Sequence, residues 1–400
     1  MKFFHTADWH LGKIVQGVHM TKDQRYILDQ FIQAVEEENP DAIIIAGDLY
    51  DRAVPPIEAV HLLNDVFERI VLQLKTPILA IAGNHDSPSR LHFGSRLMAT
   101  NGCYIAGQFD PNMKPVVLYD KHGAVHFHLV PYVDPSDVRY VFQEEHIRSH
   151  NDAMEKIIEH IMEKVDESVR HVFVGHAFVT PYGKEVENTS TSERPLSIGG
   201  AEYVDAKNFH PFHYTALGHL HQAHYVLEEN IQYSGSILKY SISEEHHQKG
   251  FNVVNMDACG NVTVERRLLQ PKRDMYTVEA SIDEILTYHK SDDYVFVRLT
   301  DEVPIFSPME KIRSIYPNAL HVERKHMLML HEGSANIKET VERTKMNDLD
   351  LFKAFYKTVK GNSLADESEQ LFQEVLDDFL KHQRESDPKQ TKEVLNNEAD

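Results

Sequence analysis

Four short polar motifs each come directly after an apolar run that the sequence predicts to be a β-strand. They are rich in aspartate, histidine and asparagine, whose side chains coordinate divalent metal ions. The motifs are Asp8-Trp9-His10, Gly47-Asp48, Gly83-Asn84-His85-Asp86, and the pair Gly175-His176 with Gly218-His219-Leu220-His221. Because ligands bind outside the carboxyl ends of the strands in α/β sheets, we expect these side chains to share one pocket.

The spacing inside the motifs favours this convergence. Asp8 and His10 lie two residues apart on a segment that we expect to be extended, so both would face one side while Trp9 faces the other. The same spacing recurs in the last motif. The candidate metal ligands are therefore Asp8, His10, Asp48, Asn84, His176, His219 and His221.

Seven ligands are too many for one ion and about right for two. The mixture of carboxylate, imidazole and amide groups suits Mn²⁺, Fe²⁺ or Zn²⁺ better than Ca²⁺ or Mg²⁺ alone. Asp48 is the candidate bridge, because a carboxylate can offer one oxygen to each ion. Two ions ~3.5–4 Å apart can stabilise both the attacking and the leaving oxygen of an in-line phosphoryl displacement.

Each motif alone also has an ordinary structural explanation. A Gly-Asp pair after an apolar run is usually a turn, and Asn and Asp commonly close strands. Two roles remain possible for three charged residues, Asp51, Arg52 and Asp86. They either hold the metal ligands in place or form simple ion pairs. His126 and His128 alternate with apolar residues inside a predicted strand, and we expect them to face solvent.

The elements that must position the motifs alternate along the chain. Apolar runs at 41–46 and 77–82 follow stretches of helical periodicity at 24–38 and 57–74. This strand–helix alternation predicts an α/β fold in which both faces of the sheet are covered. Near residue 270 the pattern changes to short alternating strands and helices, which indicates a second, α+β unit.

These patterns divide the chain into four parts. We predict a metal-binding domain over residues 1–270, a small α+β domain over 271–343, a helix-loop-helix over 344–385 and a flexible tail over 386–400. In the helix pair, large apolar side chains recur at helical spacing and form two stripes. Either the pair packs back on its own chain or, as we expect, the stripes bind a partner through Leu351, Phe352, Phe355, Leu371, Phe372, Leu376 and Phe379.

The composition limits the classes of function. Lys and Arg total 41 against 62 Asp and Glu, a net charge of −21, which is unusual for a chain that binds DNA alone. The two cysteines suit a reducing cytoplasm, and no apolar run approaches the ~20 residues of a membrane span. A P-loop sequence is absent, so we expect no ATP hydrolysis by this chain. We therefore predict a cytoplasmic protein without membrane contact, whose partner supplies a basic surface.

The order of the motifs resembles that of the calcineurin-like metallophosphoesterases. More narrowly, segments 5–13, 47–52, 83–88 and 192–200 resemble the bacterial SbcD family, the nuclease subunits of SbcCD complexes. The resemblance covers the chain from residue 1 to about 385. It implies a layered α/β/β/α core, a small α+β capping domain and a C-terminal helical hairpin.

The resemblance also implies a role for each motif residue. Asp48 would bridge the two metals, and His85 would be the catalytic histidine beside the scissile phosphate. Relatives from archaea and eukaryotes carry a second histidine where this chain has Asp51-Arg52, which leaves the balance of exonuclease and endonuclease action open. The first metal would be bound by Asp8, His10 and His221, and the second by Asn84, His176 and His219.

The activity implied by the resemblance is manganese-dependent cleavage of DNA, as an exonuclease on double-stranded ends and an endonuclease on single strands and hairpins. Such enzymes act in DNA end processing, recombination and replication with an SbcC-like ATPase. A homodimer within a heterotetramer would form through helices near 55–74 and 90–100. Two alternatives are a phosphatase or cyclic-nucleotide phosphodiesterase on the same metal core, and a non-catalytic scaffold.

Overall fold

The computed structural model describes residues 1–166, 168–183, 202–301 and 303–324, and near the C-terminus residues 352, 353, 356, 368, 369, 371, 372 and 375. The chain forms two compact units, Met1–Glu323 and Arg324–Asp400. Several sequence predictions fall outside the described residues. These are segment 192–200, residues 325–343 of the predicted α+β domain, the tail 386–400, and Leu351, Phe355, Leu376 and Phe379.

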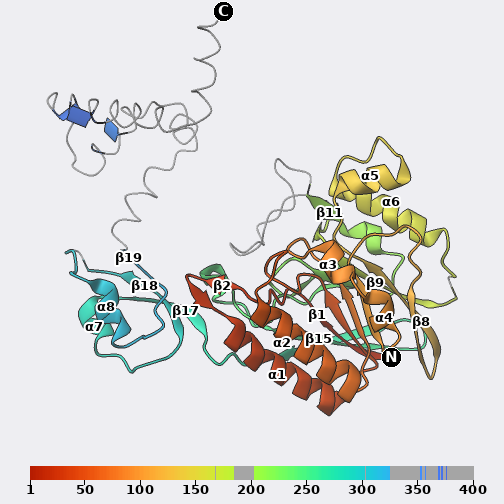
Figure 1. The fold of residues 1–400 in the computed structure, drawn as a ribbon, viewed down its shortest axis with the longest axis horizontal. Helices are drawn as coiled ribbons and strands as arrows, with labels where there is room; N and C mark the ends of the chain where they lie inside the picture. Colours follow the sequence, from red (N-terminus) through yellow and green to blue (C-terminus); the bar gives the residue numbers. More distant parts are fainter. Residues whose placement is uncertain are drawn as a thin grey trace, which may run out of the picture. The chain divides into compact units, whose positions relative to one another are not determined.

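Two six-stranded sheets form the core of the first unit (Figure 1). The order in the first sheet is β16 (Val262–Leu268), β15 (Gly250–Met256), β1 (Lys2–Thr6), β4 (Ala42–Ala46), β5 (Ile78–Ile81) and β6 (Cys103–Ala106). The order in the second is β13 (His224–Val226), β14 (Glu228–Tyr233), β12 (Tyr214–Gly218), β9 (Arg170–His176), β8 (Gly123–Val130) and β7 (Val116–Asp120). Strands β1, β4, β5 and β6 run parallel, as do β14, β12, β9 and β8, so their carboxyl ends meet at one edge of each sheet.

Alternation along the buried strands sorts their side chains into layers. In β4, Ile44 lies in the apolar cluster between the two sheets, together with Val172 and Val174 of β9. Its neighbours Ile43 and Ile45 point to the other face and join the cluster under the helices. Both faces of this strand are therefore apolar, which explains why its sequence reads as a continuous apolar run.

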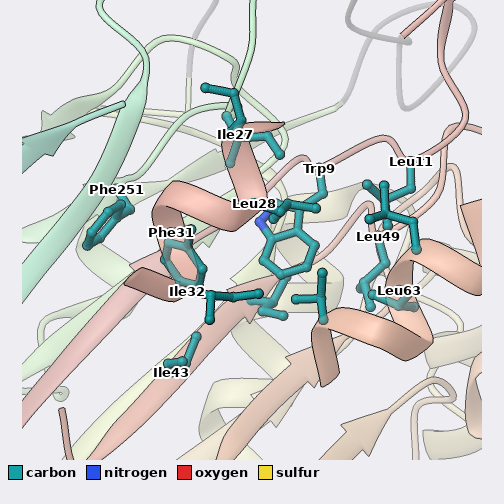
Figure 2. Packing of buried hydrophobic residues seen from close by; sticks show 14 of the residues in the cluster. Trp9, Leu11, Ile27, Leu28, Phe31, Ile32, Ile43, Leu49, Leu63 and Phe251 are labelled. Carbon is teal, nitrogen blue, oxygen red and sulfur yellow. The ribbon is translucent and has the colours of Figure 1, made fainter. Parts of the chain in front are cut away.

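Helices cover the outer face of each sheet and complete the α/β/β/α layers that the resemblance implied. On the first sheet, Trp9 packs among Leu28 and Phe31 of α1 (Thr21–Glu38) (Figure 2). On the second sheet, Ile157 of α6 (His150–Met162) packs near Phe173. The other helices of this region are α2 (Ile57–Phe67), the π-helix η1 (Glu68–Gln73), α3 (Pro88–His92), α4 (Ser95–Ala99), α5 (Pro135–Phe142), and the 3-10 helices η2 (Ala206–Phe209) and η3 (Ile242–Glu244). The short strands are β2 (Ile14–Val15), β3 (Val18–His19), β10 (Phe178–Thr180) and β11 (Tyr203–Asp205).

Residues after 270 form a small sheet with its own apolar cluster, centred on Ile285, Val295 and Ile312. Its elements are β17 (Met275–Ala280), α7 (Ile282–Ile285), β18 (Tyr294–Leu299), α8 (Pro308–Arg313) and β19 (His321–Arg324), with the strands in the order β17, β18, β19. The Tyr294 hydroxyl donates to Asp23 of α1 at 2.9 Å, which attaches this sheet to the larger core. Within the described residues, no helix is long and apolar enough to cross a membrane.

His128 does not face solvent as the sequence suggested. It is only 8% exposed, and its Nε2 lies 3.0 Å from His171 Nδ1 on the neighbouring strand. Because β8 is an interior strand of a sheet covered on both faces, alternation along it does not imply a solvated side. The prediction was wrong because the layer over that face is built from segments far along the chain.

The first strand is fixed at its start by an ion-pair cluster. The α-ammonium group of Met1 lies 2.7 Å from Asp120 of β7, and Arg170 of β9 donates to the same carboxylate at 2.6 and 2.9 Å. The Asp120 side chain is 8% exposed. Hydrogen bonds from Arg170 hold the pKa of this carboxyl well below its usual range. Asp120 thus joins the second sheet to the beginning of β1, the strand that leads to Asp8.

We expect Asp120→Asn to lower the free energy of unfolding by about 2 kcal/mol near neutral pH, because two charge-assisted contacts are lost. The folded pKa lies below the unfolded value of about 3.9, so the wild-type advantage is complete above that pH and disappears as the pH falls further. Urea unfolding at several pH values measures the difference. Asp292→Asn, at an exposed carboxylate, is the control, and a difference between wild type and Asp120→Asn that does not shrink in acid would contradict the assignment.

Candidate metal centre

Five strand ends, three from the first sheet and two from the second, meet at one point of the core. Each one carries a motif predicted from the sequence. Asp8 and His10 follow β1, Asp48 follows β4, Asn84 and His85 follow β5, His176 ends β9, and His219 and His221 follow β12. All are 6% exposed or less except Asn84, which is half-buried.

The structure brings most of the predicted ligands within ligating distance of one another. Donor atoms of Asp8, His10 and His221 form one close group, and those of Asp8, Asp48 and His176 form a second. His10 Nε2 and His221 Nε2 are 3.0 Å apart, and His176 Nε2 is 3.0 Å from Asn84 Oδ1. The first group consists of the residues that the resemblance implied for one ion. Of the residues implied for the other ion, only His176 lies in the second group, together with Asp8 and Asp48.

Asp48 occupies the middle of this arrangement. Its Oδ2 lies 3.6 Å from His10 Nε2 and 3.5 Å from His176 Nε2, so one oxygen faces both groups. Its Oδ1 accepts the backbone N–H of His85 at 2.9 Å, which fixes the orientation of the carboxylate. A carboxylate in this position is able to contact two cations at once.

His219 lies at the edge of the cluster. Its ring is centred 5.4 Å from the ring of His176, and it belongs to neither close donor group. The backbone N–H of His219 donates to both carboxylate oxygens of Asp8, at 3.0 and 3.2 Å. The residue therefore holds Asp8 through its main chain while its ring faces the second group.

The loops that carry the ligands are not extended as the spacing argument assumed. Asp8, His10, Asp48 and His219 have φ values of 53°, 44°, 51° and 105°, in the left-handed region that costs about 1–2 kcal/mol for a residue with a side chain. Asp8 and His10 thus reach the cluster through left-handed backbone and not through the alternation of an extended strand. Strained backbone of this kind is concentrated at functional sites, where the surrounding structure must enforce it.

Glycines next to the ligands allow the strand ends to approach closely. A Cβ on Gly83 would lie 2.1 Å from Asp48 Oδ1, and one on Gly218 would lie 1.9 Å from the Ala46 carbonyl oxygen. A Cβ on Gly47 would lie 2.3 Å from His176 Nδ1, which bonds to that carbonyl at 2.9 Å. The Gly-Asp, Gly-Asn-His-Asp and Gly-His motifs therefore need their glycine for space as well as for turning.

Two further side chains fasten the ligand loops. Gln24 of α1 donates to the carbonyl oxygens of Trp9 and His10, at 3.1 and 2.8 Å. Asp86 accepts the backbone N–H groups of Leu49, Tyr50 and Gly83 at 2.9–3.1 Å. Asp86 is thus a loop anchor, one of the two interpretations left open by the sequence. Gln24 was missed, and its only signal is a polar residue on the face of a helix that also buries Ile27 and Phe31.

Burial dominates the electrostatics of the histidines. It lowers the pKa values of His10 and His219 well below the usual value, and neighbouring imidazoles lower them further. Burial also lowers the pKa of His176, against the opposing effect of Asp48. Neutral imidazoles offer a ring nitrogen lone pair, which is the form that binds a metal ion.

His85 is placed differently from the ligands. Its Nδ1 lies 2.8 Å from the backbone carbonyl oxygen of Asp51, and since a carbonyl only accepts, Nδ1 carries the hydrogen. Its Nε2 then points toward the cluster, 4.0 Å from Asp48 Oδ2. Asp51 itself forms an ion pair with Lys13 at 2.8 Å, so its carboxylate is engaged beside the cluster.

The donor set fits divalent metal ions. The Nε2 atoms of His10 and His221 lie 3.0 Å apart, and His10 Nε2 is also 3.6 Å from Asp48 Oδ2. A cation bound between these atoms accounts for this arrangement better than a hydrogen bond between the two imidazoles does. His10 Nδ1 is buried without a hydrogen-bond partner in the described part of the chain. Such a cluster at the strand ends of an α/β/β/α core defines a metal-dependent phosphoesterase.

Comparison with known proteins agrees with this class. Residues 1–223 match the family model described as calcineurin-like phosphoesterase, and residues 271–360 match the type 5 capsule protein repressor C-terminal domain. The chain is 35% identical over 386 residues to the SbcD subunit of the SbcCD nuclease of Staphylococcus epidermidis, covering 96% of this chain and 97% of that protein. The solved structure of TT1561 from Thermus thermophilus aligns at 13% identity with a TM-score of 0.37, covering 66% of this chain and 98% of that one.

The chain belongs to the calcineurin-like phosphoesterases and, within them, to the SbcD family of SbcCD nuclease subunits. The resemblance inferred from the motifs is thereby confirmed. The boundaries of the four predicted parts and the individual roles of the ligands stay predictions.

We expect Gly47→Ala to weaken metal binding by more than tenfold, because the new Cβ must displace the ring of His176. Isothermal titration of the metal-free protein with Mn²⁺ measures the effect. Gly17→Ala is the matched control. Its φ of 82° is close to the 92° of Gly47, but a Cβ there meets nothing within 4 Å. Equal loss of affinity in the two variants would mean that backbone strain, and not the displaced histidine, is responsible.

Proposed function

We propose that this chain hydrolyses DNA phosphodiester bonds with two divalent metal ions, most simply Mn²⁺, as a double-strand exonuclease and a single-strand and hairpin endonuclease. The observation that carries the proposal is the single Asp48 oxygen within 3.6 Å of one ligand group and 3.5 Å of the other. The name of the relative, a subunit of the SbcCD nuclease, supports a nucleic acid as the substrate, and DNA is the substrate that the family resemblance implies. DNA end processing in recombination and replication is the corresponding cellular role.

The ligands would divide between the two ions. The metals would supply Lewis-acid stabilisation of the phosphate oxygens and a water of lowered pKa. Asp48 would hold both ions at a fixed separation, and its position is set by the N–H of His85. We assign Asp8, His10 and His221 to the first ion and Asn84, His176 and His219 to the second.

His85 would act on the reacting phosphate. Its Nδ1–H is committed to the Asp51 carbonyl oxygen, so Nε2 is the atom that can meet the substrate. A protonated Nε2 could donate to the leaving oxygen or stabilise the charge that develops on the phosphate. Because the ring is only 6% exposed, water is largely excluded from this contact.

The test of the function compares substrates under one set of conditions. With Mn²⁺, we expect linear double-stranded DNA to be degraded faster than a small phosphomonoester, and Asp48→Asn to abolish both reactions. The amide lacks the charge that both ions need. Preferential hydrolysis of the phosphomonoester would instead identify a phosphatase, and normal DNA cleavage by Asp48→Asn with full metal occupancy would reject the two-metal site.

His85→Asn should separate chemistry from metal binding. We expect this variant to bind both metals and DNA but to cut about 10²–10⁴-fold more slowly, the usual contribution of a general acid. Metal content by elemental analysis and the cleavage rate on end-labelled DNA are measured on the same preparation. A metal content that falls as steeply as the rate would make His85 a structural residue of the centre.

An SbcC-like ATPase is the proposed partner, as the relative's membership of an SbcCD complex suggests. We assign its binding to the C-terminal helix pair predicted from the sequence, through Leu351, Phe352, Phe355, Leu371, Phe372, Leu376 and Phe379. Among the described residues, the rings of Phe352 and Phe372 stack at 3.9 Å between centroids, so they face each other. Leu371 and Val375 are 63% and 61% exposed, which leaves apolar surface for a partner.

A homodimer is proposed through the face formed by α2, α3 and α4. A groove of about 400 Å³ there is lined mostly by apolar residues, including Phe93, which is 85% exposed, and Leu97 of α4 is 77% exposed. Apolar exposure of this extent marks an interaction surface. We place the complex in the cytoplasm, which suits the unpaired Cys103 and Cys259.

A further inference from the structure

A buried glutamate stands behind one of the proposed metal ligands. Glu244 ends the 3-10 helix η3 and has no exposed surface. Its Oε1 lies 3.1 Å from Nδ1 of His221, on the side of the ring away from the cluster. Nε2 of the same ring lies 3.0 Å from His10 Nε2, inside the cluster. The two nitrogens of His221 thus have separate partners on opposite sides.

This contact fixes which nitrogen of His221 carries the hydrogen. An ionised carboxylate only accepts hydrogen bonds, so Nδ1 must be the donor. Nε2 then presents its lone pair toward His10 and Asp8. A carboxylate behind a metal-binding histidine also makes the ring a stronger base and sets its orientation.

The glutamate is itself held in place by a lysine. Lys249, 7% exposed, forms a salt bridge with Oε2 of Glu244 and also donates to the backbone carbonyl oxygen of His221 at 2.9 Å. Lys249 additionally donates to Ser236 Oγ at 2.7 Å, and Oε1 of Glu244 accepts the backbone N–H of Tyr240 at 3.3 Å. One lysine therefore fixes both the main chain of the ligand and the carboxylate that orients its ring.

Stability alone gives little reason for such a pair. Buried ion pairs are often replaceable by apolar side chains without loss of stability, because desolvation offsets their attraction. Here both charges converge on one residue, His221, by its ring and by its carbonyl oxygen. The geometry is that of a support for a metal ligand.

We propose that Glu244, held by Lys249, is a positioning residue that fixes the tautomer and orientation of His221 for metal binding. The proposal rests on the proposed role of His221 as a ligand. It adds to the metal site a residue that lies 23 positions further along the chain than His221.

The experiment uses the full chain in metal-free form. Glu244→Gln alone would leave Lys249 buried without its partner and could fail to fold, so it is combined with Lys249→Met, which removes both charges together. Thermal unfolding of the metal-free protein reports folding, and calorimetric titration with Mn²⁺ reports the affinity of each site. We expect the double variant to unfold near the wild-type temperature but to bind Mn²⁺ about 10–100-fold more weakly at one site.

Glu245→Gln is the matched control. Its carboxylate is adjacent in sequence but faces the small sheet, where it accepts the backbone N–H of Thr277 at 2.7 Å. We expect this variant to bind Mn²⁺ as the wild type does. A double variant that folds and binds both ions with wild-type affinity would overturn the positioning role.

His221→Asn and the wild type distinguish this result from a failure of the proposed function. If the wild type binds two Mn²⁺ ions and His221→Asn binds one, the ligand assignment holds and the double variant alone decides the role of Glu244. If His221→Asn binds both ions normally, the assignment of His221 fails, and the role of Glu244 fails with it.

Discussion

The structure depends on keeping negative carboxylates and neutral imidazoles together in a space that water barely reaches. Asp8 and Asp48 are 0% and 2% exposed, and moving a charge out of water is costly. Backbone N–H groups of His219 and His85 offset part of that cost. Divalent cations, which the family implies, would offset the rest, so metal binding and the stability of this region are physically coupled.

The two-sheet architecture follows from this requirement. The strand ends of a single sheet lie along one edge, so their side chains approach an ion from one side. Two sheets packed face to face can place side chains on several sides of the ion. The approach is close enough that Gly47, Gly83 and Gly218 leave no room for a Cβ. The strained backbone at Asp8 and His10 is held by its surroundings. Trp9, which lies between them, is packed in the apolar cluster (Figure 2). Gln24 donates hydrogen bonds to the carbonyl oxygens of Trp9 and His10.

The acidity of the chain is compatible with a phosphate substrate only if other charges compensate. A net charge of −21 repels DNA at long range, while two metal ions would place about four positive charges at the point of contact. A partner that supplies a basic surface would complete the compensation. In this view the nuclease chain contributes the chemistry and leaves most of the affinity for DNA to the assembly.

The amino-acid sequence was enough to predict the class of fold and the kind of chemistry. Apolar runs that each end in Asp, Asn or His predict strands with candidate metal ligands at their carboxyl ends, and the order of these motifs sufficed to identify the family. These features are local, so periodicity and residue type reveal them. The sequence did not reveal the left-handed backbone at Asp8 and His10, the burial of His128, or the parts played by Gln24 and Glu244.

Those features depend on contacts between segments that are distant in sequence, and such contacts exist only once the chain has folded. His10 meets His221 across 211 residues of chain, and Gln24 bonds to Tyr240 across 216. Whether a polar side chain is a solvated surface group or a support for a ligand depends on what covers it. For Glu244 that cover is Lys249, Ser236 and the ring of His221, and nothing in its local sequence pattern distinguishes it from its exposed neighbour His246.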